Sequence, residues 1–285
     1  MTGATSGIGK ITAERLAALG ARLVLIARDR TRGEAMLARL NAVASGSYPA
    51  VHYADLSRLA EISGVADKIA AAETRVDVLI NNAGAIFSRR AVTADGLEHT
   101  FALNHMSYFI LTTRLLDRLV AGAPARIINT ASNAHRMGHL DFNDLQSVRS
   151  YRPFGVYGTS KLCNILFTRE LARRLPPRNV TANSFSPGFV ATRFGDRSGG
   201  LFAAGLRCAK LFAKTPEHGA ETLIYLASSP DVATVSGEFF YEGRRGTVTQ
   251  EAQDDAAAQR LWLESERIAV RATGGDGPGP TKASA

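Results

Sequence analysis

The sequence predicts a single α/β domain built on a doubly wound parallel sheet with helices on both faces. Short β-rich runs alternate along the chain with longer runs of helical periodicity. Most of the short runs are largely apolar rather than alternating, which is typical of strands that are covered on both faces. No long linker or shift in composition divides the 285 residues, so we expect one domain over residues 1–272 and a disordered Gly/Pro-rich tail over 273–285.

The order of the elements follows from these runs. The expected strands are Arg22–Ala27, Ala50–Tyr53, Asp77–Asn81, Arg126–Thr130, Val180–Phe185 and Glu238–Tyr241. The expected helices are Ile8–Leu19, Thr31–Val43, Ala60–Glu73, Gly96–Val120, Val156–Arg174 and Pro216–Ala227.

Composition excludes several classes of function. The net charge of +8 is spread along the chain rather than gathered in one run, so we expect no nucleic-acid binding. Cys163, Cys208 and the six histidines show no metal-ligand spacing, so we expect no metal site. The chain contains no apolar run long enough to span a membrane and opens on no signal peptide, which predicts a cytoplasmic protein.

A glycine-rich loop, TGATSGIG, occupies residues 2–9 and runs directly into the first expected helix. Glycines let the backbone turn tightly and approach a pyrophosphate, and a helix N-terminus presents N–H groups to that anion. Because the spacing differs from G-x-G-x-x-G, an ordinary turn is the alternative. The residues expected to contact a dinucleotide are Gly3, Thr5, Ser6, Gly7, Ile8 and Gly9.

The loop begins at Thr2, although in this fold it follows the first strand, which lies at the middle of the sheet. A typical strand has about five or six residues, so Met1 cannot supply it. We therefore expect the first strand to be missing from the given sequence, with roughly six to ten apolar residues upstream. A gap or a distortion is then expected beside Leu23–Ala27.

Arg28 ends the next strand, where an acidic residue often binds the ribose 2′-hydroxyl of NAD. A guanidinium can instead grip a 2′-phosphate with two hydrogen bonds and stack on adenine. This favours NADP(H) over NAD(H) as the cofactor. The adjacent Asp29 keeps NAD(H) open.

Two further segments follow strands at the expected cofactor edge. Asp55 and Leu56 are placed to contact adenine, although an Asp there also caps helices. Asn82, Ala83 and Gly84 lie in the string NNAG, where small residues let a cofactor approach and a plain turn is the alternative.

Tyr157 and Lys161 form Y-x-x-x-K on one face of an expected helix. A nearby ammonium stabilises a phenolate, so we expect Lys161 to lower the pKa of Tyr157 and to bind the cofactor ribose. Ser132 can hydrogen-bond a substrate oxygen, and Asn104 can hold a water that links Lys161 to solvent. Alone, the pattern is more often an exposed helix pair.

Together these strings resemble the classical short-chain dehydrogenase/reductase family, in its retinol-dehydrogenase-like branch, which has a Rossmann fold. The resemblance implies a catalytic tetrad of Asn104, Ser132, Tyr157 and Lys161, with Tyr157 as general acid/base. It also implies that the cofactor's nicotinamide end contacts Pro187, Gly188, Val190 and Thr192. The chain departs from the branch at Ala131 and at Ser186, and we infer no loss of function from either.

The substrate is expected to be a lipophilic alcohol or carbonyl compound, because an apolar segment near 193–214 follows the nicotinamide loop and can form a lid. Two alternatives are a catalytically silent NADP(H)-binding regulator and an extended-type sugar-nucleotide epimerase or dehydratase. The helices over Gly96–Val120 and Val156–Arg174 resemble the family's subunit-pairing surface, so we expect a homodimer or homotetramer. We expect no contact with a membrane surface.

Overall fold

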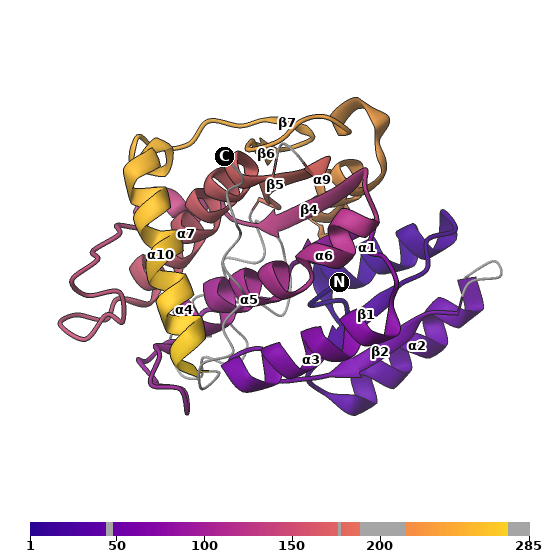
Figure 1. Cartoon of the computed structure of the whole chain (residues 1–285), viewed down its shortest axis with the longest axis horizontal. Coiled ribbons are helices and arrows are strands. Elements are labelled where there is room, and N and C mark those ends of the chain that lie inside the picture. Colours follow the sequence, from indigo (N-terminus) through magenta and orange to yellow (C-terminus); the bar gives the residue numbers. More distant parts are fainter. Residues whose placement is uncertain (44–47, 176–177, 189–214, 273–285) are drawn as a thin grey trace.

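The computed structural model describes residues 1–43, 48–175, 178–188 and 215–272. A mostly parallel sheet lies between two layers of helices (Figure 1). β1 (Val24–Ala27) pairs with β2 (Ala50–Tyr53) in parallel. A second group runs in the order β3 (Val78–Asn81), β4 (Ala125–Thr130), β5 (Val180–Ser186), β6 (Phe239–Tyr241) and β7 (Arg244–Arg245), and only β7 is antiparallel to its neighbour.

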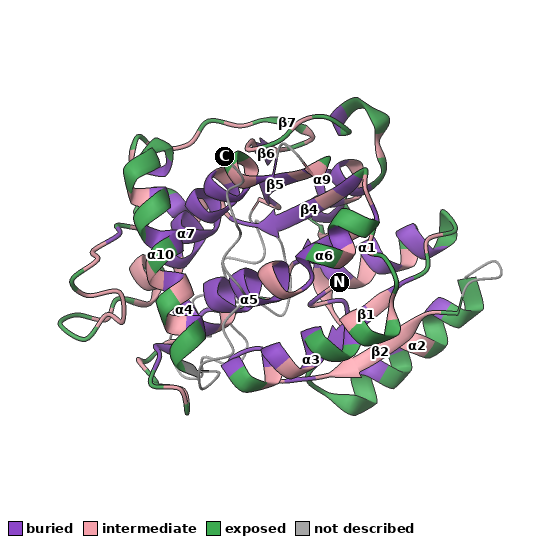
Figure 2. Cartoon of the chain, viewed as in Figure 1, coloured by how far each residue is buried: buried purple, intermediate pink, exposed green. Residues whose placement is uncertain are grey.

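Two apolar cores lie on opposite faces of the sheet, because successive strand residues point to opposite faces. One core receives Leu25, Ile80 and Ile128, and the other receives their neighbours Ile26, Leu79 and Ile127. Figure 2 shows β4 and the inner helix faces mostly buried, β2 intermediate and the outer helix faces exposed. This double burial explains why most of the strands are largely apolar, and the arrangement confirms the predicted doubly wound fold.

Three helices cover the first core, namely α1 (Gly7–Ala18), α2 (Arg30–Val43) and α9 (Pro216–Ser228). The second core is covered by α3 (Leu59–Ala72), α5 (Ser107–Arg114), α6 (Leu116–Ala121) and α7 (Pro153–Arg174). Short helical turns are η2 (Asn133–Met137), η5 (Pro230–Val232) and η6 (Glu251–Gln253).

The predicted elements recur within three residues of their expected bounds, with one exception. The helix expected over Gly96–Val120 is broken into α4 (His99–Phe101), a π-helical turn η1 (Ala102–Met106), α5 and α6. The π-helical turn carries Asn104, and such turns are frequent at functional sites.

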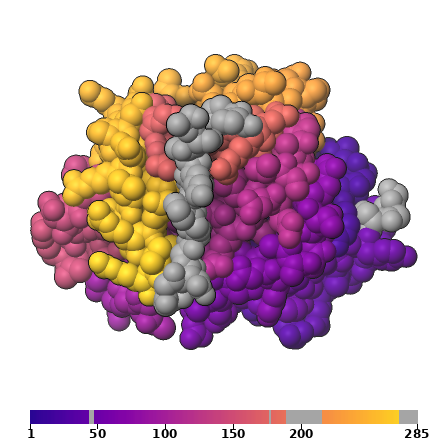
Figure 3. Space-filling view, in the orientation of Figure 1, coloured from indigo at the N-terminus to yellow at the C-terminus, as the bar shows by residue number. Residues whose placement is uncertain are grey.

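A further helix, α10 (Asp255–Ala272), was not predicted and packs on the outside of α7 (Figure 1). Trp262 stacks on Phe167 with ring centroids 5.8 Å apart, and the guanidinium of Arg174 lies 4.3 Å from the Trp262 ring. The outer side of α10, in yellow, lies exposed on the left part of the surface in Figure 3. α10 therefore covers part of the helix surface that the resemblance assigns to subunit pairing.

Between β1 and β3 lie only Met1 and Thr2 among the described residues. The Ile26 N–H donates to Met1 O at 3.0 Å, and the Thr2 N–H donates to Ile80 O at 2.9 Å. Thr2 and Ile26 form an isolated parallel bridge rather than a strand. The sheet is thus divided at the predicted place, with two residues where a strand of about five is usual.

No helix among the described residues is long and apolar enough to cross a membrane.

Candidate active site

The glycine-rich loop packs directly against the end of β3. The Thr2 hydroxyl accepts the backbone N–H groups of Asn82 and Ala83 at 2.8 and 2.9 Å. Gly3 has a φ of +69°, and a Cβ on it would lie 2.7 Å from Asn82 Nδ2. A Cβ on Gly9 would collide with Gly3 O. Side chains at these two positions would therefore separate the loop from the NNAG segment.

The N-terminus of α1 opens at this loop. Its N-cap residue Ser6 makes no side-chain cap hydrogen bond, and the first turn contains no acidic residue. The N–H groups of a first helical turn have no partners within the helix, and they carry the positive end of its dipole. The loop and the helix end together form a cradle that fits an anionic phosphate group.

Of the two charged residues that directly follow β1, Arg28 is exposed and Asp29 caps a helix. Arg28 is exposed directly after β1. Burial acts against ionisation of Asp55, but hydrogen bonds from Ser57 and the charge of Arg28 lower the Asp55 pKa below its ordinary value. Asp29 instead holds the start of α2, because its Oδ1 accepts the Arg32 N–H at 2.9 Å. Leu56 is buried beside Asp55.

Tyr157 and Lys161 lie on α7 with Lys161 Nζ 5.5 Å from the Tyr157 ring centroid. Lys161 Nζ donates to Thr130 O, the last carbonyl of β4, at 2.9 Å. Ser132 follows two residues later, caps η2 by accepting the Ala134 N–H at 3.1 Å, and hydrogen-bonds the Tyr157 side chain. The end of β4 and the face of α7 thus bring three of the predicted catalytic residues together.

The pKa of Tyr157 differs from the expectation, and burial of both side chains explains the difference. Burial lowers the pKa of Lys161 to about 7. Burial also raises the pKa of Tyr157 above its ordinary value, and the hydrogen bond with Ser132 opposes that rise only in part. The Tyr157 pKa is therefore raised rather than lowered as expected, because removing the phenolate from water is the largest cause of the shift and Ser132, rather than Lys161, opposes it.

Asn104 joins the same group from η1. Its Oδ1 accepts the Ala85 N–H at 2.9 Å, and its Nδ2 donates to Ala85 O at 2.9 Å and to Ser160 Oγ at 3.0 Å. A Cβ on Gly84 would lie 3.2 Å from Asn104 Oδ1 and 3.5 Å from Lys161 Nζ. Gly84, Asn104 and Lys161 are therefore immediate neighbours.

The nicotinamide loop is described only at its start. Gly188 has a φ of +80°, and its N–H donates to Ser186 Oγ at 3.3 Å. Ser186 Oγ also accepts the Asn133 N–H at 3.0 Å, which ties the end of β5 to the residue after Ser132. Pro187 lies between Ser186 and Gly188. Val190, Thr192 and the lid expected over 193–214 fall outside the described residues.

Sequence reasoning missed three residues that support this site. Ser186 was noted only as a departure, and Thr130 only as a strand end. Asn164 lies one turn beyond Lys161 and donates to the same Thr130 carbonyl at 3.1 Å. The extension Y-x-x-x-K-x-x-N, with its buried face, was the available signal.

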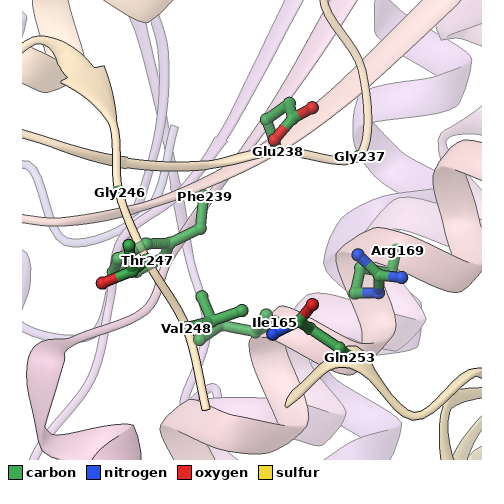
Figure 4. A pocket seen from close by; sticks show the side chains of 9 residues that line it. All are labelled: Ile165, Arg169, Gly237, Glu238, Phe239, Gly246, Thr247, Val248 and Gln253. Atoms are coloured by element: carbon green, nitrogen blue, oxygen red, sulfur yellow. The ribbon is translucent and has the colours of Figure 1, made fainter. Parts of the chain in front are cut away.

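A separate hollow of about 390 Å³ lies beside the C-terminal half of α7. Arg169 lies on one side of it and Thr247 on the other, with Phe239 between them (Figure 4). None of the lining residues is a predicted site residue, and Arg169 and Glu238 are already paired with Asp255 and Arg245. Among the described residues, no group of His, Cys, Asp or Glu could hold a metal ion.

Comparisons with known proteins agree with this geometry. Residues 1–199 match the family described as short chain dehydrogenase. Human retinol dehydrogenase 13 is 40% identical over 274 residues, which cover 94% of this chain and 83% of the relative. Retinol dehydrogenase 14 of Mus musculus is 41% identical over 279 residues, which cover 93% of this chain and 84% of the relative.

Solved structures show the same fold. A crystal structure of an uncharacterized protein from Mycobacterium paratuberculosis superimposes with a TM-score of 0.75 at 31% identity, covering 94% of this chain and 91% of the other. A short chain dehydrogenase from Burkholderia cenocepacia J2315 in complex with NADP superimposes with a TM-score of 0.66 at 25% identity, covering 84% and 93%. The chain belongs to the short-chain dehydrogenase/reductase family, in its retinol-dehydrogenase-like branch, and is an oxidoreductase of that family.

Proposed function

We propose that the chain interconverts a lipophilic alcohol and its carbonyl compound with NADP(H), and that Tyr157 is the general acid/base. The observation that carries this proposal is the convergence of Asn104, Ser132, Tyr157 and Lys161 beside the glycine-rich loop. When bound, the nicotinamide supplies the acceptor or donor of hydride. The loop from Gly3 to Gly9 would hold its pyrophosphate.

The protein's own residues hold and donate the proton that the reaction requires. Because burial raises the pKa of Tyr157, its phenol holds the proton at neutral pH and can donate it to a carbonyl oxygen. Ser132 hydrogen-bonds the phenol and is placed to hold the same substrate oxygen. With a pKa of about 7, Lys161 is partly charged under the same conditions and can bind the ribose.

The proposed preference for NADP(H) rests on the different positions of Arg28 and Asp29, the two residues that follow β1. Asp29 caps α2 with its Oδ1, which removes one acceptor from a ribose 2′-hydroxyl. Arg28 is exposed, and its charge faces the cofactor edge near Asp55. A guanidinium in this position suits a 2′-phosphate. The Burkholderia relative bound to NADP supports the same choice.

Assembly and location remain predictions from the sequence. A homodimer or homotetramer would have to pair through surfaces other than the part of α7 that α10 covers. We likewise propose a cytoplasmic location and a lipophilic substrate.

The test is the substitution Tyr157→Phe, which removes the phenolic proton and keeps the ring. We expect turnover with NADPH and an aliphatic aldehyde to fall by ~10²–10⁴-fold, while the Kd for NADPH changes by less than about twofold. Lys161→Ala should weaken both turnover and NADPH binding. Near-native turnover by Tyr157→Phe would rule out the assigned role.

A matched control is Tyr225→Phe on α9, in the other helical layer, which should leave turnover unchanged. A wild-type protein that binds NADPH tightly but oxidises it with no carbonyl compound would instead point to a silent NADP(H)-binding regulator.

A further inference from the structure

His135 is a fully buried histidine in η2, just after Ser132, and the proposed mechanism does not use it. Its ring lies against Phe239 of β6, with the ring centroids 5.4 Å apart. His135 Nδ1 lies 2.7 Å from Ser132 O, and His135 Nε2 accepts the Thr249 N–H at 3.3 Å. Both ring nitrogens are therefore bonded to backbone groups, one at Ser132 and the other in the segment after β7.

The tautomer of His135 is fixed by these two partners. A carbonyl oxygen can only accept a hydrogen bond, and a backbone N–H can only donate one. Nδ1 therefore carries the proton and donates it to Ser132 O, while Nε2 is the acceptor. Burial lowers the pKa of His135 below its ordinary value, so the ring is neutral at neutral pH, as this arrangement requires.

The peptide group between Ser132 and Asn133 is held at both of its polar atoms. Ser132 O accepts two N–H groups of His135, from Nδ1 at 2.7 Å and from the backbone at 3.0 Å. On the other side, the Asn133 N–H donates to Ser186 Oγ at 3.0 Å. A peptide group is planar, so holding both atoms fixes the ψ angle of Ser132, which is 155°. The place of Ser132 Oγ beside Tyr157 depends on that angle.

Residues 246–251, which follow β7, contact η2 at two neighbouring points. Arg136 Nη2 donates to Thr247 O at 2.7 Å, and the Thr249 N–H donates to His135 Nε2. Arg136 is exposed, whereas His135 is buried. The ring of His135 is thus the buried connection between this segment and the Ser132 carbonyl.

We propose that His135 is a positioning residue whose Nδ1–H donates to the Ser132 carbonyl and so holds Ser132 Oγ beside Tyr157, with Nε2 anchored by the Thr249 N–H. Its effect on turnover rests on the proposed function of Ser132 and Tyr157. Its hold on the Ser132 peptide group does not, because that hold is present in the protein without cofactor. The two can therefore be tested separately.

Three substitutions separate the two bonds of the ring. In His135→Asn the amide nitrogen can take the place of Nδ1 and donate to Ser132 O, but nothing replaces Nε2. In His135→Gln the longer side chain can bring its oxygen to the place of Nε2 and accept the Thr249 N–H, but the donor to Ser132 O is lost. His135→Phe keeps a ring against Phe239 and loses both bonds.

The first readout is backbone amide exchange in the protein without cofactor, measured by mass spectrometry on a peptide that covers η2. The first N–H groups of this peptide bond to Ser186 Oγ, Ser132 Oγ and Ser132 O, so they report whether the Ser132 peptide group is held. His135→Gln and His135→Phe should raise their exchange about fivefold, the equivalent of one net hydrogen bond. His135→Asn should stay within about twofold of the wild type.

Thr222→Val on α9 is the matched control. The buried Thr222 hydroxyl also accepts a backbone N–H, that of Gly243 at 3.0 Å, but it lies outside the site. This variant should lower stability without changing exchange in η2. The same rise in Thr222→Val would show general loosening and would overturn the proposal, as would equal exchange in His135→Asn and His135→Gln. If His135→Phe does not fold, the comparison of Asn with Gln decides alone.

Turnover with NADPH and an aliphatic aldehyde supplies the second readout. His135→Gln should lower kcat about five- to tenfold and keep the Kd for NADPH within about twofold, whereas His135→Asn should keep kcat within about twofold. In a Ser132→Ala background, His135→Gln should lower the residual kcat by less than about twofold, because a positioning residue acts through the residue that it positions. An equal loss in both backgrounds would indicate a general structural role and overturn the proposal.

The two readouts distinguish failure of this proposal from failure of the proposed function. If amide exchange responds as expected but the wild type oxidises no NADPH, the hold on Ser132 stands and the proposed function fails. If the wild type is active and exchange in η2 is unchanged in His135→Gln and His135→Phe, the positioning role fails and the function stands.

Discussion

Replacing Lys161 with Met removes a buried ammonium group and should change how stability depends on pH. Burial lowers the pKa of Lys161 from 10.5 to about 7 in the folded protein. Below about pH 7 the lysine is protonated in both the folded and unfolded states, so the folded protein carries the full cost of the buried charge. Between about pH 7 and 10.5 only the unfolded state keeps the proton, and the free energy of unfolding rises with pH.

The size of this effect follows from the pKa. A pKa that falls from 10.5 to about 7 corresponds to about 5 kcal/mol. The Met variant lacks this cost and loses the hydrogen bond to Thr130 O, which is worth about 1 kcal/mol. We therefore expect Lys161→Met to be more stable than the wild type by up to about 4 kcal/mol at about pH 6.

Urea unfolding measures this difference, with the fluorescence of Trp262, the one tryptophan of the chain, as the signal. Above about pH 7 the advantage of Lys161→Met should shrink by about 1.4 kcal/mol per pH unit. The exposed Lys68→Met serves as control and should differ from the wild type by the same small amount at every pH. A pH-independent difference for Lys161→Met would refute the buried-charge reasoning.

Three further substitutions test other parts of the account. Arg28→Ala should raise the Kd for NADPH about ten- to a hundredfold and leave NADH binding nearly unchanged, as measured by fluorescence titration; equal losses for both cofactors would contradict the assigned role. Gly84→Ala places a methyl group against Asn104 and Lys161, so kcat should fall while thermal stability changes little; unaltered kinetics would show that the contact is tolerated. Trp262→Ala should destabilise the protein by about 3–5 kcal/mol in urea unfolding, whereas the exposed neighbour Leu263→Ala should change it by under about 0.5 kcal/mol; similar effects would mean that α10 is not docked through Trp262.

Most of the strands could be predicted because they are largely apolar on both faces, a pattern typical of a covered sheet. α10 was missed because it packs on α7 rather than on the sheet, so the alternation of strands and helices gave no place for it. The helix over Gly96–Val120 was predicted as continuous because periodicity does not reveal a π-helical turn. Asn104 lies in that turn, where its side chain meets Ala85 and Ser160.

The principal site residues came from motifs whose spacing is fixed by local structure, such as Tyr157 and Lys161 on one helix face. The residues behind them did not, because Asn164 meets the Thr130 carbonyl, and His105 meets Ser265, only through tertiary packing. The pKa of Tyr157 was mispredicted for a related reason. The sequence shows that a lysine is near, but not how deeply the phenol is buried.

The most direct test of the central claim is whether the wild-type protein oxidises NADPH in the presence of aliphatic aldehydes of increasing chain length. We predict carbonyl-dependent oxidation, slower with NADH, whose kcat/KM rises about fourfold for each added methylene until the site is filled, because each buried methylene contributes about 0.8 kcal/mol. A rate that does not depend on chain length would contradict a lipophilic site, and faster oxidation of NADH would contradict the role of Arg28. If no aldehyde stimulates the oxidation of NADPH or NADH by a protein that binds them, the proposed function is wrong.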